Sequence, residues 1–166
     1  MGGANAEEYG ELDTALFRGH AVREYTEQHY LPAAAAYRER TADKGAVGRS
    51  IVNWEHTLKE KWGMLRFGDL KVQTNAAQHI FEAEVYLIDL DPNLVRVELC
   101  ADGINGGSPI RQEMARVRQL AGASGVYVYS AAVSAARPPA DYTARVIPHC
   151  DGVAIPLEDA RILWQR

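Results

Sequence analysis

The spacing of apolar residues changes in the middle of this chain, and the change limits the fold more than any other feature of the sequence. Between residues 47 and 62 large apolar side chains recur every three or four positions, which places them on one face of a helix. After Phe67 and Gly68 the spacing falls to two, the repeat of a half-buried strand. The sequence therefore predicts an α+β fold, with a helical N-terminal segment at 1–66 and a β-sandwich domain at 67–166. The helical stripe consists of Val47, Ile51, Trp54, Leu58 and Trp62.

Two further helices are predicted before this stripe. From residue 13 to 30 apolar side chains again fall three to four apart. We expect Leu31 and Pro32 to interrupt this helix, because proline lacks the backbone donor and disfavours helix at the residue before it. A short second helix then runs over 33–40 and ends at Asp43-Lys44-Gly45. The apolar face of the first helix comprises Leu16, Phe17, Ala21, Val22 and Tyr25.

The second part of the chain reads as short strands separated by turn residues. In 81–87 the apolar residues occupy alternate positions, and the same alternation recurs in 95–99. About seven strands at this spacing predict an antiparallel β-sandwich of immunoglobulin-like type. The predicted strands are 70–74, 81–87, 95–99, 110–117, 125–133, 141–149 and 160–164.

Charge and composition exclude several classes of protein. With 18 basic and 22 acidic residues the net charge is -4, and the basic residues are scattered, so we expect no nucleic-acid partner. No apolar run approaches the roughly 18 residues of a membrane-spanning helix, and the first residues lack the pattern of a secretory signal. We therefore expect a cytoplasmic protein without a membrane partner, in which Cys100 and Cys150 stay reduced.

The sequence carries no motif for a phosphate loop, a dinucleotide site, a zinc protease or a serine hydrolase. His149, Cys150 and Asp151 are adjacent, but consecutive strand residues point to opposite faces, so they do not form a ligand set. We predict no catalytic, cofactor-binding or metal-binding residue in this chain.

Aromatic side chains offer one candidate binding function. Tyr127, Tyr129 and Trp164 lie on predicted strands, and their flat faces are suited to stacking on sugar rings. Tyr127 and Tyr129 share one strand face, and packing in the core explains Trp164, in a closing strand, better than sugar stacking does. Glycan binding through these residues is an alternative hypothesis that the sequence leaves open.

Several stretches resemble the C-terminal end of bacterial α-glucan (glycogen or maltodextrin) phosphorylases. The most specific is the closing run at 137–149, RPPADYTARVIPH, followed by GVAIPLE at 152–158 and ILWQ at 162–165. Earlier matches are VREYTEQHYLPA at 22–33, LRFG at 65–68 and VRVELCADG at 95–103. The sequence departs from the family at Cys150 and Asp151, and residues 1–15 do not resemble it.

The resemblance implies a non-catalytic role for this chain. Enzymes of the family cleave α-1,4-glucans with inorganic phosphate, release glucose 1-phosphate and use pyridoxal phosphate, which is bound by a lysine upstream of the matched part. None of Lys44, Lys59, Lys61 or Lys71 has a comparable setting, so no catalytic residue is carried over. We expect a structural or interaction domain whose partner is the catalytic lobe of the parent enzyme. If that lobe is absent, the first helix would either fold back on the sandwich or pair with a second copy of the chain, and we favour the homodimer.

Overall fold

The computed structural model describes residues 22–24, 26–104 and 106–166, and the chain divides into two units at Ser50 and Ile51. The described part of the first unit is helical. A π-helix, η1, spans Thr26–Tyr30, and α2 spans Leu31–Lys61 and continues into the second unit. Within the described residues no helix combines the length and the apolar character that crossing a bilayer requires.

The predicted interruption at Leu31 and Pro32 is wrong. Helical backbone lies on both sides of Pro32, since η1 directly precedes the first residue of α2. Pro32 has no N–H to bond to the fourth residue before it, and its ring crowds that carbonyl. The wider π-turn accommodates the proline, so helical backbone continues from Thr26 through Pro32. Residues 13–21 of the first predicted helix lie outside the described residues.

The predicted break at Asp43-Lys44-Gly45 is confirmed. These three residues have φ angles of 49°, 58° and 76°, and Ala42 has a ψ of 158°, so the backbone leaves the helical region before α2 resumes. The Arg49 side chain donates a hydrogen bond to the Lys44 carbonyl across this kink. Gly45 is the natural residue here, because glycine adopts positive φ without steric cost.

The last part of α2, residues 51–61, belongs to the second unit, as its apolar stripe requires. Trp54 and Leu58 are buried in the core, and Ile51 and Trp62 pack against it. The Trp54 indole Nε1 donates to the Leu94 carbonyl at 3.4 Å. The Lys61 ammonium lies 2.8 Å from the Asp89 carboxylate. The helical prediction for this stripe is therefore confirmed.

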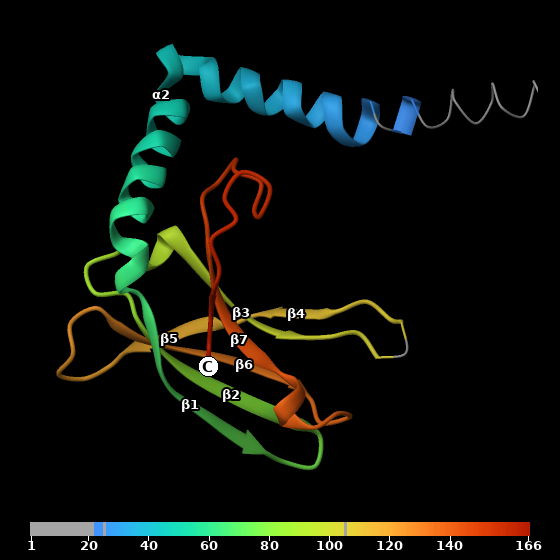
Figure 1. Ribbon diagram of the computed structural model, residues 1–166, viewed down its shortest axis with the longest axis vertical. Coiled ribbons are helices and arrows are strands. Elements are labelled where there is room, and N and C mark those ends of the chain that lie inside the picture. Colours follow the sequence, from blue (N-terminus) through green and yellow to red (C-terminus); the bar gives the residue numbers. More distant parts are fainter. Residues whose placement is uncertain (1–21, 25, 105) are drawn as a thin grey trace, which may run out of the picture. The chain divides into compact units, whose positions relative to one another are not determined.

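The rest of the second unit is a β-sandwich of two four-stranded antiparallel sheets (Figure 1). The first sheet has the order β1-β2-β6-β5 and the second has the order β4-β3-β7-β8. This order is the immunoglobulin arrangement, with one additional strand at the edge of the second sheet. The strands are β1 (Arg66–Thr74), β2 (Gln78–Tyr86), β3 (Val95–Ala101), β4 (Ile110–Glu113), β5 (Ala115–Gln119), β6 (Val126–Ser134), β7 (Thr143–Pro148) and β8 (Leu163–Trp164).

The single strand predicted at 110–117 is wrong, because the structure divides it at Met114. β4 pairs with β3 in one sheet, while β5 pairs with β6 in the other. Met114 lies between them, is buried, and donates its backbone N–H to the Val97 carbonyl at 2.9 Å. The chain thus crosses from one sheet to the other at this residue, which raises the strand count from seven to eight.

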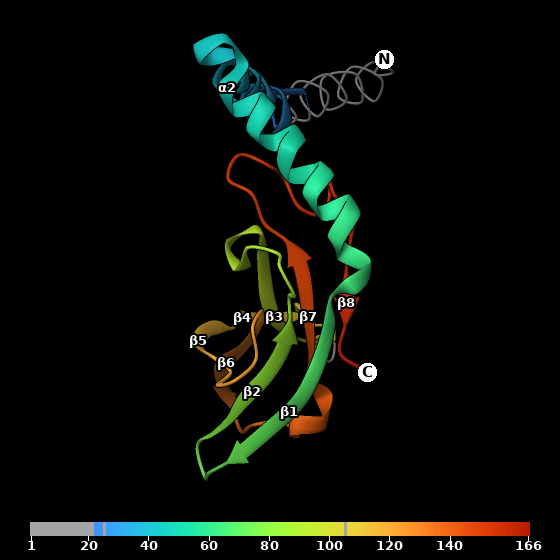
Figure 2. The ribbon, with the colours of Figure 1, turned by 90° about the vertical axis from the view of Figure 1, so that its left-hand side faces the viewer.

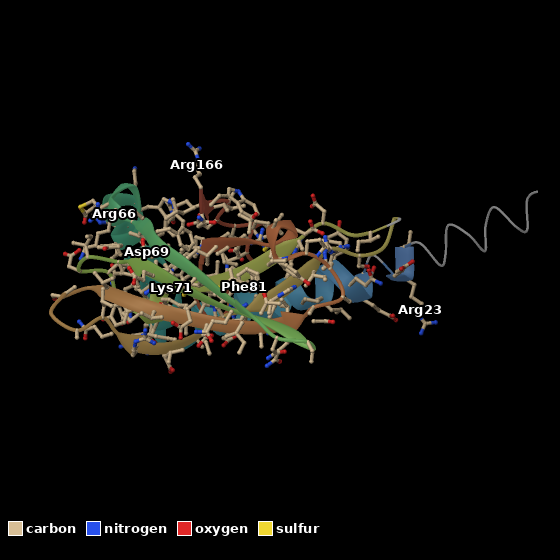
Figure 3. The ribbon with its side chains drawn as sticks, turned by 90° about the horizontal axis from the view of Figure 1, so that it is seen from below. Arg23, Arg66, Asp69, Lys71, Phe81 and Arg166 are labelled. Carbon is tan, nitrogen blue, oxygen red and sulfur yellow. The ribbon has the colours of Figure 1, made fainter. Side chains whose placement is uncertain are left out.

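The core lies between the two sheets and follows the predicted alternation. Along β2 the inward residues Phe81, Ala83 and Val85 are all buried, and the same holds for Val95, Val97, Leu99 and Ala101 along β3. Figure 3 shows Arg66, Asp69 and Lys71 along β1, with Phe81 on the neighbouring strand β2. Phe81 also lies against the Tyr142 ring, with 5.6 Å between their centroids.

Candidate functional site

The outer face of the second sheet carries a group of charged side chains that the strand register brings together. Because alternate residues of β3 point into the core, Arg96, Glu98 and Cys100 point outward. The register places Glu98 opposite Arg145 on β7. Trp164 on β8 is in turn opposite Arg145, and Figure 2 shows β8 beside β7.

Arg145 is held between a carboxylate and an aromatic ring. Its Nε and Nη2 atoms donate to Glu98 Oε2 at 2.9 and 2.6 Å. The two side chains are only 13% and 12% exposed, which protects the pair from screening by solvent. The Arg145 guanidinium also lies over the Trp164 ring, 5.4 Å from its centroid. This contact orients the indole while Trp164 remains 44% exposed.

A second arginine contacts a histidine at the end of β7. Arg96 Nε lies 3.3 Å from Glu113 Oε2, and Arg96 Nη2 lies 3.2 Å from His149 Nδ1. A guanidinium has donors only, so His149 Nδ1 is the acceptor in this contact. The imidazole proton is therefore assigned to Nε2, which leaves that nitrogen as a donor.

A third arginine differs from the other two in its contacts. Arg111 on β4 is opposite Cys100 in the register, yet it forms no hydrogen bond or ion pair with any residue the structure describes. Burial raises the pKa of the Cys100 thiol, against a smaller opposing effect of the Arg145 and Arg111 charges. Cys100 is thus held as a neutral thiol, while the Arg111 guanidinium keeps its donors available.

Two hollows adjoin on this face and share Arg111 and Arg145. The first has a volume of about 410 Å³ and is lined by Trp164, Thr143, Pro109 and Ile110 together with two carboxylates and two guanidiniums. Those charged groups are Asp102, Asp141, Arg111 and Arg145. Its formal charges cancel, and it combines an aromatic surface with polar donors and acceptors.

The second hollow has a volume of about 440 Å³ and a different lining. Three guanidiniums, from Arg96, Arg111 and Arg145, and the His149 imidazole line it together with the Glu98 carboxylate. A largely apolar wall faces them, formed by Ile147, Pro148, Val153, Ile155, Pro156 and Ile162. Asp151 also lines it, with an exposed side chain whose Oδ1 lies 3.9 Å from His149 Nε2. The hollow therefore has a cationic side and an apolar side.

The structure does not bring the three aromatic residues singled out in the sequence together. Tyr127 and Tyr129 lie opposite Val85 and Ala83, so both face the core between the sheets. Tyr129 is 4% exposed, and burial raises its pKa to about 12. Trp164 lies on the other sheet and on its outer face.

Sequence reasoning missed the three arginines of this face. The alternation in β3 and β7 indicates that Arg96 and Arg145 point outward. It does not indicate that β3 and β7 are neighbours, nor that β4 adds Arg111 beside them.

The apolar face of the first predicted helix, which we expected to mediate a homodimer, is largely outside the described residues. Val22 is described and is exposed. The other members of that face, Leu16, Phe17, Ala21 and Tyr25, lie outside the described residues.

Comparison with known proteins relates the chain to one enzyme. No protein-family model matches it. Glycogen phosphorylases of Mycobacterium tuberculosis (strain H37Rv) and Mycobacterium bovis are each 26% identical to it over 147 residues. The alignment covers 82% of this chain but 17% of the relative, so the chain spans about a sixth of the length of these curated relatives. The chain thus has weak sequence similarity to a fragment of glycogen phosphorylase.

Proposed function

We propose that this chain acts as a non-catalytic C-terminal domain of an α-glucan phosphorylase, with a structural or interaction role. The observation that carries the proposal is the extent of the alignment. It runs through most of this chain yet reaches only a small part of each mycobacterial enzyme. The parent activity is the release of glucose 1-phosphate from α-1,4-glucans by inorganic phosphate.

The packing shows that the end of the helical segment belongs to the sandwich domain. The core includes Trp54 and Leu58 from α2 together with residues from both sheets. The segment that leads into the sandwich is therefore part of the folded unit. We propose the catalytic lobe of the parent enzyme as its partner.

The first experiment tests catalysis by the chain itself. The purified chain is incubated with maltoheptaose, inorganic phosphate and pyridoxal phosphate, with M. tuberculosis glycogen phosphorylase as positive control. We expect no glucose 1-phosphate from the chain alone. Release of glucose 1-phosphate at a rate proportional to chain concentration would show that the proposal is wrong.

A second experiment tests the partner. The mycobacterial enzyme is prepared without the 17% of its length that aligns here, and this chain is added in trans. We expect a stoichiometric complex and a higher melting temperature for the truncated enzyme. Absence of a complex, when the enzyme's own excised segment does form one, contradicts the interaction role.

A second candidate function, glycan binding, rests on the exposure of Trp164 beside the charge-balanced hollow. A neutral sugar ring matches this lining, because the indole offers a stacking surface while carboxylates and guanidiniums offer partners for hydroxyl groups. Asp141 and Arg145 both lie in this lining. We propose Trp164 as the sugar platform, because Tyr129 is buried and the half-buried Tyr127 packs against the core on the other sheet.

Electrophoresis in gels with and without amylopectin tests the second candidate. We expect amylopectin to retard the wild-type chain, and we expect Trp164→Ala to remove the retardation. Tyr37→Ala is the matched control, since it removes an exposed aromatic side chain in the helical unit. Equal mobility of the wild type in both gels, or equal retardation of both variants, rules out Trp164 as a glycan platform.

A further inference from the structure

The second hollow has features that neither the phosphorylase proposal nor the glycan proposal uses. A neutral glucan does not need three guanidiniums from three different strands beside a histidine donor. Its volume of about 440 Å³ falls within the range of about 300 to 1,000 Å³ that small-molecule pockets occupy. It therefore has room for a ligand larger than a single ion.

The donors in this hollow are fixed by contacts within the sheet. Glu98 holds Arg145 through Nε and Nη2. Glu113 and His149 hold Arg96 through Nε and Nη2. Each guanidinium carries five N–H donors, so both arginines retain donors beyond those used in these contacts. Such preorganised groups bind an anion at a lower entropic cost than free surface side chains.

The charges on this face favour an anion. Glu98 is neutralised by Arg145, and the remaining carboxylate of the lining, Asp151, is exposed to solvent. Arg111 has no counter-ion among the described residues, so its charge is available to a ligand. Asp151 Oδ1 lies 3.9 Å from His149 Nε2, which is beyond hydrogen-bond distance, so the Nε2 proton remains a donor for a ligand.

We infer that this hollow binds a phosphate group, either as inorganic phosphate or as a phosphate monoester of a small organic molecule. Guanidiniums are well matched to phosphate, because their planar N–H groups pair with its oxygens in bidentate fashion. Arg111 supplies the uncompensated charge, and Arg96 and Arg145 supply oriented donors. The wall of Ile147, Ile155 and Ile162 provides a surface for the organic part of a monoester. This site is independent of the proposed phosphorylase role.

Calorimetric titration at constant ionic strength tests the inference with three probes: inorganic phosphate, glucose 1-phosphate and glucose. We expect both phosphate probes to bind with a stoichiometry of one per chain, and we expect glucose to bind at least tenfold more weakly. Equal affinity for the two phosphate probes assigns the site to the phosphate group alone. Tighter binding of glucose 1-phosphate assigns it to monoesters. Absence of binding by either phosphate probe at millimolar concentration overturns the inference.

Three variants locate the site. Arg111→Gln is expected to weaken phosphate binding at least tenfold without disturbing the fold, since Arg111 forms no ion pair or hydrogen bond with the described residues. Arg118→Gln is the matched control, because Arg118 is an exposed arginine on the other sheet, where it pairs with Glu82. An equal loss of phosphate affinity in these two variants would show a general effect of net charge and would overturn the assignment of the site.

The third variant separates the two hollows. Trp164 lines the first hollow and not the second. We therefore expect Trp164→Ala to keep its phosphate affinity within about twofold of wild type, while losing any retardation by amylopectin. Because Arg111 lines both hollows, a loss of phosphate binding in Trp164→Ala as large as that in Arg111→Gln contradicts the assignment to the second hollow.

Discussion

The two parts of α2 on either side of the kink have similar helical backbone but opposite burial. Before the kink none of the residues from 31 to 41 is buried, and Leu31 and Tyr37 are exposed. After the kink Trp54 and Leu58 lie in the sandwich core. The first part has local contacts such as the hydrogen bond from the Thr41 hydroxyl to the Tyr37 carbonyl at 2.9 Å, whereas the second also contacts distant strands. The difference shows that an apolar residue contributes to stability through its tertiary partner and not through helix formation alone.

The largest expected effect compares the same substitution on the two sides of the kink. Leu58 is 0% exposed and Leu31 is 59% exposed. We expect Leu58→Ala to lower the free energy of unfolding by about 2 to 5 kcal/mol, because it removes buried methyl groups and leaves a cavity. Leu31→Ala should change it by less than about 0.5 kcal/mol. Urea unfolding followed by tryptophan fluorescence measures both, and equal effects would contradict the comparison.

A second pair of variants compares two glycines with positive φ. Gly125 has a φ of 72°, and an added Cβ would lie 1.7 Å from the Ile88 carbonyl oxygen, where the ends of β2 and β6 meet. Gly45 in the kink has a φ of 76° and meets only ordinary contacts at 3.8 Å. We expect Gly125→Ala to cost about 2 to 4 kcal/mol from backbone strain and displacement.

Gly45→Ala is the control for this pair. Its strain falls in the first unit, where none of the described residues is buried, so the main unfolding transition should shift by less than about 0.5 kcal/mol. Thermal unfolding monitored by circular dichroism compares the two variants. A larger loss from Gly45→Ala would show that the kink and the sandwich unfold together.

A smaller effect is expected from Tyr129, whose hydroxyl is buried without a hydrogen-bond partner among the described residues. Tyr129→Phe should leave stability at pH 7 unchanged or raise it by about 1 kcal/mol, because an unsatisfied polar group is removed. Burial raises the Tyr129 pKa to about 12, so the unfolded chain ionises first on going to alkaline pH. The folded state keeps the Tyr129 phenol neutral to a higher pH than the unfolded chain does. The free energy of unfolding is therefore unaffected by this group below pH 10 and falls as pH rises from 10 to about 12.

Unfolding by urea as a function of pH tests the sign of this linkage. The wild type should lose stability relative to Tyr129→Phe between about pH 10 and 12. Parallel pH curves for the two proteins would show that Tyr129 ionises as freely in the folded state as in the unfolded chain.

The smallest effect compares two exposed ion pairs, one in each unit. The Lys61 ammonium hydrogen-bonds the Asp89 carboxylate and lowers the Asp89 pKa. The resulting stabilisation is present above the ordinary carboxyl pKa and is lost as pH falls through the lowered value. We expect Asp89→Asn to reduce stability slightly at pH 7 and to match wild type at acidic pH and at high salt.

Glu27→Gln is the counterpart in the helical unit, where it removes the pair with Arg23. Because no tertiary contact among the described residues depends on this pair, we expect no measurable change in the main unfolding transition. Chemical denaturation at pH 7 and below pH 4 compares the variants. A difference between Asp89→Asn and wild type that persists at low pH would exclude the ionised pair as its cause.

Local sequence patterns predicted most of the secondary structure because they act over a few residues. The stripe from Ile51 to Trp62 and the alternation in β2 and β3 depend only on which side of an element faces the core. The kink at Gly45 follows from a backbone preference. The prediction that the helix breaks at Pro32 was wrong, and the reason is also local. A π-turn makes room for the proline ring and does not need its missing N–H, so the helix continues.

The sequence by itself determined the α+β division, the α2 stripe and the inward residues of each central strand, since periodicity is a property of neighbouring residues. Only the tertiary structure decided that the chain changes sheets at Met114 and that Tyr129 is buried while Trp164 remains exposed. It also decided that Arg96, Arg111 and Arg145 share one face. Strand order and register bring together residues that are far apart in the sequence, as in the pair of Glu98 and Arg145, which are 47 positions apart. The partners come from separate parts of the chain, so no local pattern encodes the pairing.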